Sequence, residues 1–203
     1  SNRFLQKKFG GILLPHCRDT TVLDPLKFNS DKIKEKMGFK NKKIVMFLGT
    51  LRPHKGVDDL LAALKIIDNP DLKLAIIGAE NHHEFLEKVE KSIRPRVVVL
   101  PKMPFEKLPE FLSAADIVAI PQRQTADSVG QVPAKLFDAM SMAKPIIATR
   151  VSDIPEVLED CGYLVDPSEP GQLADGIQYI LSHPGEAKAK GYAARERCKQ
   201  RYD

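Results

Sequence analysis

The chain has 203 residues, of which 43% are hydrophobic and 29% are charged, a composition typical of a soluble globular protein. Its net charge of +4 is mild and its basic residues are dispersed, so we expect no nucleic-acid partner, although a basic patch could touch an anionic membrane surface. No apolar run is long enough to span a bilayer, and no signal peptide is evident. The three cysteines lack metal or redox spacing and indicate a reducing compartment. Because the sequence does not begin with Met, we expect a piece of a longer protein.

The first forty residues predict short, separate elements. A helix is expected over residues 2–9, followed by a short apolar strand over residues 12–14. A loop leads to another short helix over residues 31–37, which Ser30 can cap.

From residue 44 onward, strands alternate with helices. Continuous apolar runs predict buried strands over residues 44–48, 72–77, 96–100, 117–120, 145–148 and 162–165. Helical spacing of apolar residues predicts helices over residues 56–67, 83–92, 106–114, 133–142, 169–182 and 185–200. This alternation indicates an α/β fold with a Rossmann-like, doubly wound parallel sheet of about six strands. Ligands of such sheets bind at the carboxyl ends of the strands.

Residues 127–149 form a loop, a helix and a strand in succession. A loop that enters a helix leaves free backbone N–H groups at a partly positive helix end, which can hold a phosphate. Lys135 in the first turn is unfavourable for the helix dipole, so a bound anion would explain it. The alternative is an ordinary amphipathic helix on which Lys135 and Asp138 are solvated.

A second candidate is the turn from Gly49 to Gly56, directly after the first strand of the alternation. Glycines let the backbone approach a ligand closely, and Arg52 and Lys55 could bind phosphate oxygens. The turn is neither a P-loop nor a dinucleotide fingerprint. A basic surface turn is the alternative.

Weaker candidates follow the next two strands. Gly78 could border a ligand or only end its strand, and Met103 lies in a proline-stiffened loop that could border a nucleobase or only connect elements. His54 could contact phosphate or be solvent-exposed. The adjacent His82 and His83 lack the spacing of a metal site.

Together these segments resemble the carboxyl-terminal, donor-binding domain of GT-B glycosyltransferases, specifically the retaining group called family 4, or glycosyl transferases group 1. The resemblance covers roughly residues 12–202 and rests on motifs that follow the family's order. These motifs are Phe47-Leu48-Gly49 with Pro53-His54-Lys55-Gly56, Leu74-Ala75-Ile76-Ile77-Gly78, Leu108-Pro109-Glu110-Phe111 with Ala114-Ala115-Asp116-Ile117-Val118, Lys135-Leu136-Phe137-Asp138-Ala139-Met140, Lys144-Pro145-Ile146-Ile147, Ile154-Pro155-Glu156-Val157 and Gly162-Tyr163-Leu164-Val165.

The resemblance also implies roles for individual residues. Arg52 and Lys55 would be catalytic, because they would neutralise the leaving diphosphate, and Asp138 would hold the ribose hydroxyls. Other contacts to the donor nucleotide would come from Gly49, Gly78, Met103, Val132, Ala134 and Lys135. Contacts to the donor sugar would come from Asp127, Ser128, Gly130 and Gln131. The chain departs from the family at Gly130, where the family usually has a glutamate that faces the sugar, and at Thr50, where an arginine is common.

The resemblance finally implies the organisation of the whole enzyme. Residues 1–40 would be an interdomain linker region with a lead-in helix, and residues 41–203 would bind the nucleotide-sugar donor. The amino-terminal acceptor domain would be absent, so this fragment alone would be inactive. The donor would be a nucleotide diphosphate sugar, most plausibly a UDP- or GDP-sugar, with no metal and no cofactor, and with an unknown acceptor. The enzyme would be cytoplasmic, with peripheral contact to the inner membrane face through the missing domain.

Two rival functions remain at this point. A sugar-nucleotide epimerase can use the same two-domain architecture, although no convincing base is evident in this chain. A sugar-nucleotide sensor or scaffold without activity would fit the missing glutamate at Gly130. The product formed by the full-length protein would separate a transferase from an epimerase, and any turnover would exclude a scaffold.

Overall fold

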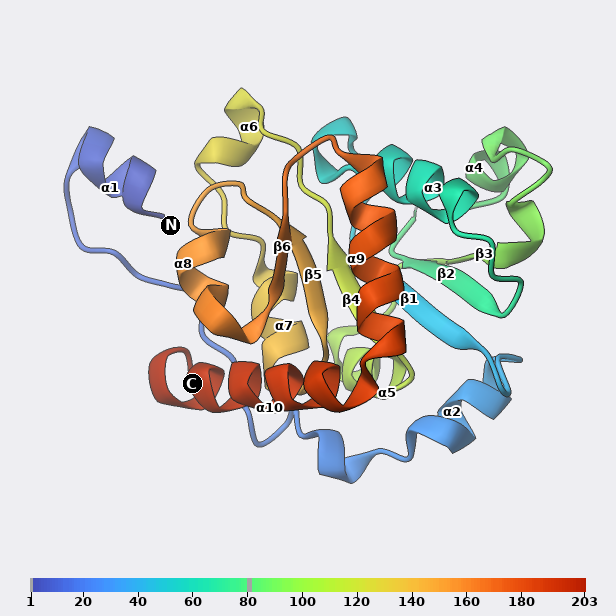
Figure 1. Cartoon of the computed structure of the whole chain (residues 1–203). Coiled ribbons are helices and arrows are strands. Elements are labelled where there is room, and N and C mark those ends of the chain that lie inside the picture. The colour runs from blue at the N-terminus through green and yellow to red at the C-terminus, as the bar shows by residue number, and fades with distance from the viewer. Residues whose placement is uncertain (1, 80–81) are drawn as a thin grey trace.

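The computed structural model describes residues 2–79 and 82–203, with only the backbone of His82. In this part of the chain, six parallel strands form one sheet in the order β3-β2-β1-β4-β5-β6 (Figure 1). The strands are β1 (Lys43–Leu48), β2 (Leu72–Ile77), β3 (Val97–Leu100), β4 (Ile117–Ile120), β5 (Ile146–Thr149) and β6 (Tyr163–Val165). The doubly wound α/β fold predicted from the alternation is therefore confirmed.

The strand order reverses between β1 and β4. These strands pair only through Val45 with Ile117 and through Met46 with Val118, whereas β1 pairs with β2 along its whole length. The last residues of β1 therefore have no ladder partner on the β4 side. In doubly wound sheets this switch point is where a ligand-binding crevice opens beyond the carboxyl ends of the strands.

Helices cover both faces of the sheet because the strands are apolar on both sides. One face packs against α2 (Ser30–Lys36), α5 (Leu108–Ser113), α7 (Ala134–Ser141), α8 (Ile154–Leu158) and α10 (Pro184–Arg201). The other face packs against α3 (Val57–Ile66) and α9 (Pro170–Ser182), with apolar side chains of α4 (His82–Lys88) at its edge. Figure 1 shows α9 across the front of the sheet and α10 along its lower border.

The last residues of the chain, Tyr202 and Asp203, contact residues 18–20 beside α7. The backbone N–H of Arg18 donates to the carbonyl of Tyr202 at 2.7 Å, and the hydroxyl of Thr20 donates to the carboxylate of Asp203 at 2.6 Å. The ring of Tyr202 packs edge-on against Phe137 of α7, with 4.8 Å between ring centroids. Residues 16–20, far from α7 in sequence, are thereby held beside it.

The prediction of a strand over residues 12–14 is wrong. Ile12 and Leu14 are 87% and 72% exposed, and no described strand lies beside them to complete a sheet. Two short helices, α6 (Ala126–Val129) and α8, were not predicted, because four or five residues are too few to show a helical period. Asn29, rather than Ser30, caps α2. The other predicted elements are present, with bounds that differ by a few residues.

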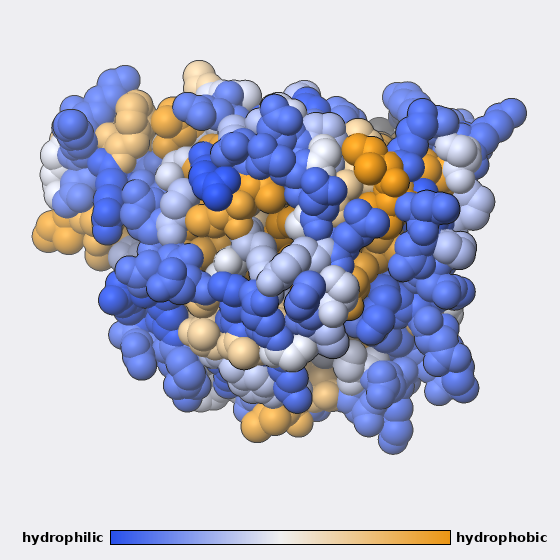
Figure 2. All heavy atoms as spheres, in the orientation of Figure 1, coloured by the Kyte–Doolittle hydropathy of each residue, from blue (hydrophilic) through white to orange (hydrophobic). Residues whose placement is uncertain are grey.

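Polar side chains cover most of the surface seen in Figure 2, with hydrophobic atoms exposed between them. The exposed hydrophobic side chains include Phe4 and Phe9 of α1 (Arg3–Phe9), a helix that stands apart from the sheet in Figure 1. Among the described residues, no helix combines the length and the apolar character that crossing a bilayer requires.

Candidate functional site

A cavity of about 610 Å³ lies beyond the carboxyl ends of β1 and β2 and in front of the first turn of α7. Nine of the predicted site residues line it: Gly49, Lys55, Gly78, Met103, Gly130, Gln131, Val132, Ala134 and Lys135. The remaining four, Arg52, Asp127, Ser128 and Asp138, are not among its lining residues. The structure thus brings together segments that follow four different strands, β1 to β4, at the switch point of the sheet.

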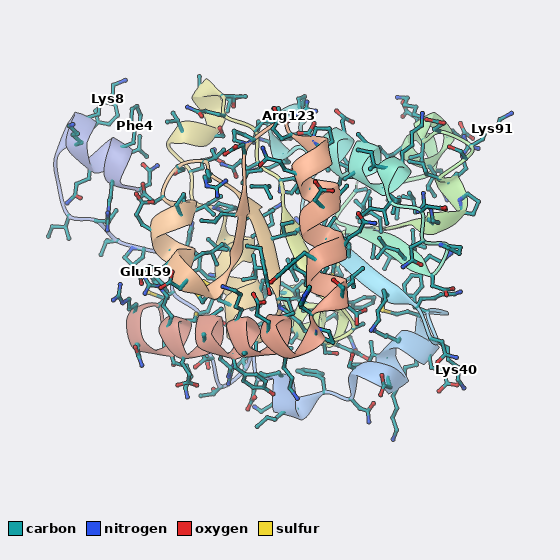
Figure 3. All side chains as sticks on the ribbon, viewed as in Figure 1. Phe4, Lys8, Lys40, Lys91, Arg123 and Glu159 are labelled. Carbon is teal, nitrogen blue, oxygen red and sulfur yellow. The ribbon has the colours of Figure 1, made fainter. Side chains whose placement is uncertain are left out.

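The turn between β1 and α3 is fixed by close packing at Gly56. This glycine has a left-handed backbone (φ 68°), and a Cβ atom there would lie 1.8 Å from the carbonyl oxygen of Pro121. Only glycine fits both requirements. Arg123, labelled in Figure 3, ties the same two segments together, because its guanidinium donates to both carboxylate oxygens of Asp59 in α3, at 2.6 and 2.8 Å. Lys55 is therefore held at a rigid corner.

Among the described residues, the cavity is lined by basic side chains and by no acidic one. Lys55, Lys102 and Lys135 all border it. Burial, and then the charge of Arg52, lowers the pKa of Lys55. The ammonium of Lys55 reaches the side-chain oxygen of Gln131 at 3.3 Å across the cavity mouth. This excess of positive charge suits an anionic ligand.

Lys135 is the most perturbed of these groups. Its ammonium donates a hydrogen bond to the carbonyl of Leu48 and lies 3.9 Å from the centroid of the Phe47 ring. Burial, with a smaller contribution from Lys55, lowers its pKa to about 7. A group that must give up hydration to keep its charge would gain from a bound anion.

The start of α7 offers unused backbone donors. The N–H groups of Val132, Ala134 and Lys135 donate no hydrogen bond within the described part of the chain, and Pro133, the N-cap residue, carries no N–H and supplies no side-chain cap. Donors at a helix amino terminus favour anions because of the helix dipole. The free donors that the predicted anion site requires are thus present, although Pro133 lies one position earlier than the first-turn position predicted.

Three predicted residues lie beside the cavity rather than in its wall. Arg52 is exposed, and Asp127 is exposed with its carboxylate 4.0 Å from Nδ1 of His54. His54 itself is buried, and burial together with neighbouring cations lowers its pKa. Ser128 is fully buried, and its hydroxyl completes the capping box of α6 with Thr125 and donates to the carbonyl of Arg123 at 2.6 Å. In this conformation the hydroxyl of Ser128 stabilises the loop that contains it, through its bonds to Thr125 and Arg123.

Asp138 is buried and paired with Arg18, which sequence reasoning did not identify. The guanidinium of Arg18 donates to Oδ1 of Asp138 and to the carbonyl of Ala134, the latter at 3.3 Å. Burial raises the pKa of Asp138, and the charge of Arg18 opposes that rise. Oδ2 accepts no hydrogen bond from a described residue. Among the described residues, one fully buried side-chain atom lacks a hydrogen-bond partner, and it is Oε1 of Gln122. Oδ2 of Asp138, which also lacks a partner, is therefore not fully buried and keeps contact with solvent.

The other end of the cavity is apolar and was predicted only in part. Met103 lines it as expected, and Phe105, Leu108 and His16 join it. Burial lowers the pKa of His16, so its ring is neutral near pH 7. No local pattern in the sequence marks His16 or Arg18, because their partners in α7 lie more than one hundred residues away.

The described residues contain no group of three or more His, Cys, Asp or Glu side chains arranged to hold a metal ion. This finding does not cover the whole His82-His83 pair noted in the sequence, because the side chain of His82 lies outside the described residues. Glu80, two residues after Gly78, is also outside the described residues.

Solved structures with the same fold include sucrose-phosphate synthase from Thermosynechococcus elongatus, with a TM-score of 0.83 and 22% identity over 98% of this chain and 52% of that one. The HepE protein of Anabaena, solved in complex with UDP-glucose, has a TM-score of 0.78 and 21% identity over 92% of this chain and 52% of that one. At these identities the likeness establishes the fold alone.

Among curated relatives, a GDP-mannose-dependent α-(1-6)-phosphatidylinositol monomannoside mannosyltransferase of Mycolicibacterium smegmatis is 28% identical over 193 residues. The match covers 90% of this chain and 50% of the relative, so the chain spans about half the length of that protein. Residues 29–197, well over half of the chain, match the family model described as glycosyl transferases group 1. The chain belongs to the glycosyl transferases group 1 family.

Proposed function

We propose that this chain is the donor-binding, carboxyl-terminal half of a retaining family 4 glycosyltransferase, which transfers a sugar from a nucleotide diphosphate sugar. One observation carries the proposal: a cavity at the sheet's switch point whose described charged side chains, Lys55, Lys102 and Lys135, are all basic, and that faces the free N–H groups at the start of α7. This arrangement suits a diphosphate.

The diphosphate would lie between the turn after β1 and the start of α7. Lys55 and Lys135 would donate to its oxygens, with the N–H groups of Val132, Ala134 and Lys135. When the bond between sugar and diphosphate breaks, negative charge grows on the leaving diphosphate, and preorganised donors lower the barrier by stabilising that charge. Arg52 would add positive charge at the rim of the cavity. Its side chain is exposed and could turn toward the diphosphate by a rotamer change.

The nucleoside would occupy the apolar end of the cavity, against Met103 and Phe105, with the backbone at Gly49 and Gly78 close to it. Oδ2 of Asp138, left without a partner by Arg18, would accept from a ribose hydroxyl. Titration with a UDP-sugar and a GDP-sugar distinguishes a site for uracil from a site for guanine.

The sugar would face the loop that ends at Val132. Gln131 and Gly130 border the cavity and are its nearest polar and backbone contacts. Asp127 would assist from the rim. We assign Ser128 to the support of this loop, because its hydroxyl is fully committed inside the protein.

The half-length match supports a proposal for the rest of the enzyme. Residues 1–40 would lead from an acceptor domain and residues 41–203 would bind the donor, without metal, so this chain alone would bind a donor without transferring its sugar. A cytoplasmic enzyme with peripheral membrane contact through the other half fits this division. One observation favours a second candidate, a sensor that binds a nucleotide sugar without turnover: the described residues that line the cavity near Gly130 include no carboxylate.

Calorimetric titration of this chain with UDP-glucose, GDP-mannose and ADP-glucose tests the proposal. We expect one base to be preferred, and Lys55→Ala to weaken binding by at least about 1.5 kcal/mol, the lower value for a hydrogen bond to a charged group. Lys65→Ala is the matched control, because Lys65 pairs with Glu90 on the surface of α3. Absence of binding by every nucleotide sugar would refute a donor site. Turnover by the full-length protein separates the transferase from the sensor.

A further inference from the structure

Two buried side-chain amides hold the loop in front of α7. Gln122 lies just after β4 and Asn2 lies just before α1, and each is 1% exposed. Neither residue lines the cavity. Both contact the loop at residues 128–131, Gln122 from six positions before it in sequence and Asn2 from the start of the described chain.

Gln122 holds two carbonyls of this loop. Its Nε2 donates to the carbonyl of Ser128 at 3.2 Å and to that of Gln131 at 3.3 Å. The backbone of Gln122 is itself fixed, because the hydroxyl of Thr149 in β5 donates to its carbonyl at 2.5 Å. The amide therefore connects the loop to the rigid edge of the sheet.

Asn2 holds the carbonyl between those two. Its Nδ2 donates to the carbonyl of Val129 at 2.6 Å and to the hydroxyl of Ser152 at 2.7 Å, while its Oδ1 caps α1 by accepting from the N–H of Leu5 at 3.0 Å. The side chain of Leu5 covers Gly130 so closely that a Cβ atom there would lie 3.3 Å from it. The first residues of the chain are thus packed onto the loop.

These hydrogen bonds hold the carbonyl groups of the loop and leave the N–H groups at the start of α7 free. With the carbonyls of Ser128, Val129 and Gln131 turned toward Gln122 and Asn2, the N–H groups that follow, from Val132 to Lys135, stay without protein partners next to the cavity. A loop held in its binding conformation before the ligand arrives binds it more tightly.

We propose that Gln122 and Asn2 are positioning residues of the donor site, which orient the loop at residues 128–131 so that the N–H groups before and within the first turn of α7 face the diphosphate. This inference rests on the proposed function for its ligand. It adds two residues that touch no ligand and that no motif marks.

The unused oxygen of Gln122 supports a role beyond folding. In the described chain, Oε1 of Gln122 is the fully buried side-chain atom that has no hydrogen-bond partner. Turning the amide over would place this oxygen against two carbonyls, so the observed orientation serves the loop and leaves Oε1 unsatisfied. A residue kept only for stability would not leave a buried acceptor without a partner.

Replacing Gln122 with Met tests this argument, because Met is similar in volume. The substitution removes both hydrogen bonds from Nε2 to the loop and the unsatisfied Oε1. The carbonyl of Ser128 keeps its bond from the N–H of Gln131 at 3.0 Å. We therefore expect an unchanged or higher melting temperature, about tenfold faster amide exchange at residues 129–131, whose N–H groups donate to backbone carbonyls, and about five- to tenfold weaker binding of UDP-glucose or GDP-mannose, whichever the wild type prefers. Gln172→Met, which removes an amide that holds the backbone of Asp166, is the control.

Asn2→Asp is the second test. Asp keeps the oxygen that caps α1 but replaces the donor to Val129 with an oxygen that repels the carbonyl. Asn29→Asp makes the same change at the cap of α2, where the side chain only accepts from the N–H of Lys32. We expect faster loop exchange and weaker binding in Asn2→Asp alone.

Unchanged loop exchange in Gln122→Met, or faster exchange with unchanged affinity, would overturn the inference, as would equal effects of the two Asn variants. If the wild type binds no nucleotide sugar, the proposed function fails by itself, and amide exchange in the unliganded chain still decides whether the two amides hold the loop.

Discussion

Replacing Lys135 with Met should remove the pH dependence of nucleotide-sugar binding. In the structure, the ammonium of Lys135 lies against the carbonyl of Leu48 and the ring of Phe47, and burial lowers its pKa to about 7. A bound diphosphate favours the protonated form and raises that pKa again. Met has a similar length and apolar packing, but it carries no charge.

The size of the effect follows from this pKa. At pH 6 the free site is almost fully protonated, whereas at pH 8 protonating it costs about 1.4 kcal/mol, one pKa unit, so affinity should be about tenfold weaker at pH 8 than at pH 6. In Lys135→Met this decline should vanish, and affinity at pH 6 should fall by about 1.5–3 kcal/mol, the range for a hydrogen bond to a charged group.

Calorimetry with a nucleotide sugar at pH 6, 7 and 8 measures both quantities. A nucleotide sugar is a suitable probe because its diphosphate has no terminal phosphate group, whose second proton would titrate near pH 6. Lys65→Met, on the surface of α3, controls for the loss of one positive charge. A wild-type affinity that is constant from pH 6 to pH 8, or an equal decline in Lys135→Met, would refute the reasoning.

Further predictions concern stability, measured by urea unfolding. Gly56→Ala should cost several kcal/mol, since its Cβ would collide with the carbonyl of Pro121 at a left-handed residue, whereas Gly185→Ala, with open space, should not destabilise. Arg18→Gln should cost about 3 kcal/mol at pH 7, where Asp138 loses its partner while charged. Because burial raises the pKa of Asp138 and Arg18 opposes that rise, this cost should shrink toward pH 4 as the carboxyl is protonated, and adding Asp138→Asn should reduce it at pH 7. A cost that is the same at both pH values would contradict this account.

Most of the sheet could be predicted from the sequence because local physics determines it. A parallel strand covered on both faces must be a continuous apolar run, and β1, β2 and β4 are such runs that end near Gly49, Gly78 and Pro121. The same reasoning failed at Ile12, because an apolar run becomes a strand only where a neighbouring strand completes its hydrogen bonds.

The candidate site likewise contains residues that could be predicted from the sequence and residues that could not. Residues that follow strand ends, such as Lys55, Gly78 and Lys135, could be predicted, because the topology brings strand ends to one edge. The partners that complete the site could not, because Arg18 meets Asp138 across 120 positions and Asn2 meets Val129 across 127 positions. Contacts of this kind depend on how the chain ends pack, which no local pattern records.

The structure contradicts one of the two interpretations of α7 that the sequence left open, the helix with solvated Lys135 and Asp138. In an ordinary amphipathic helix Lys135 and Asp138 would be solvated, but Asp138 is buried and the ammonium of Lys135 lies against the Phe47 ring with its pKa lowered to about 7. Gln122, whose Oε1 has no partner in the described chain, donates to the carbonyl of Gln131, three residues before α7. Each of these features costs stability, and all three belong to α7 or to the loop that leads into it. Proteins retain such costs where binding requires them, so their concentration here supports the anion site more strongly than any single residue does.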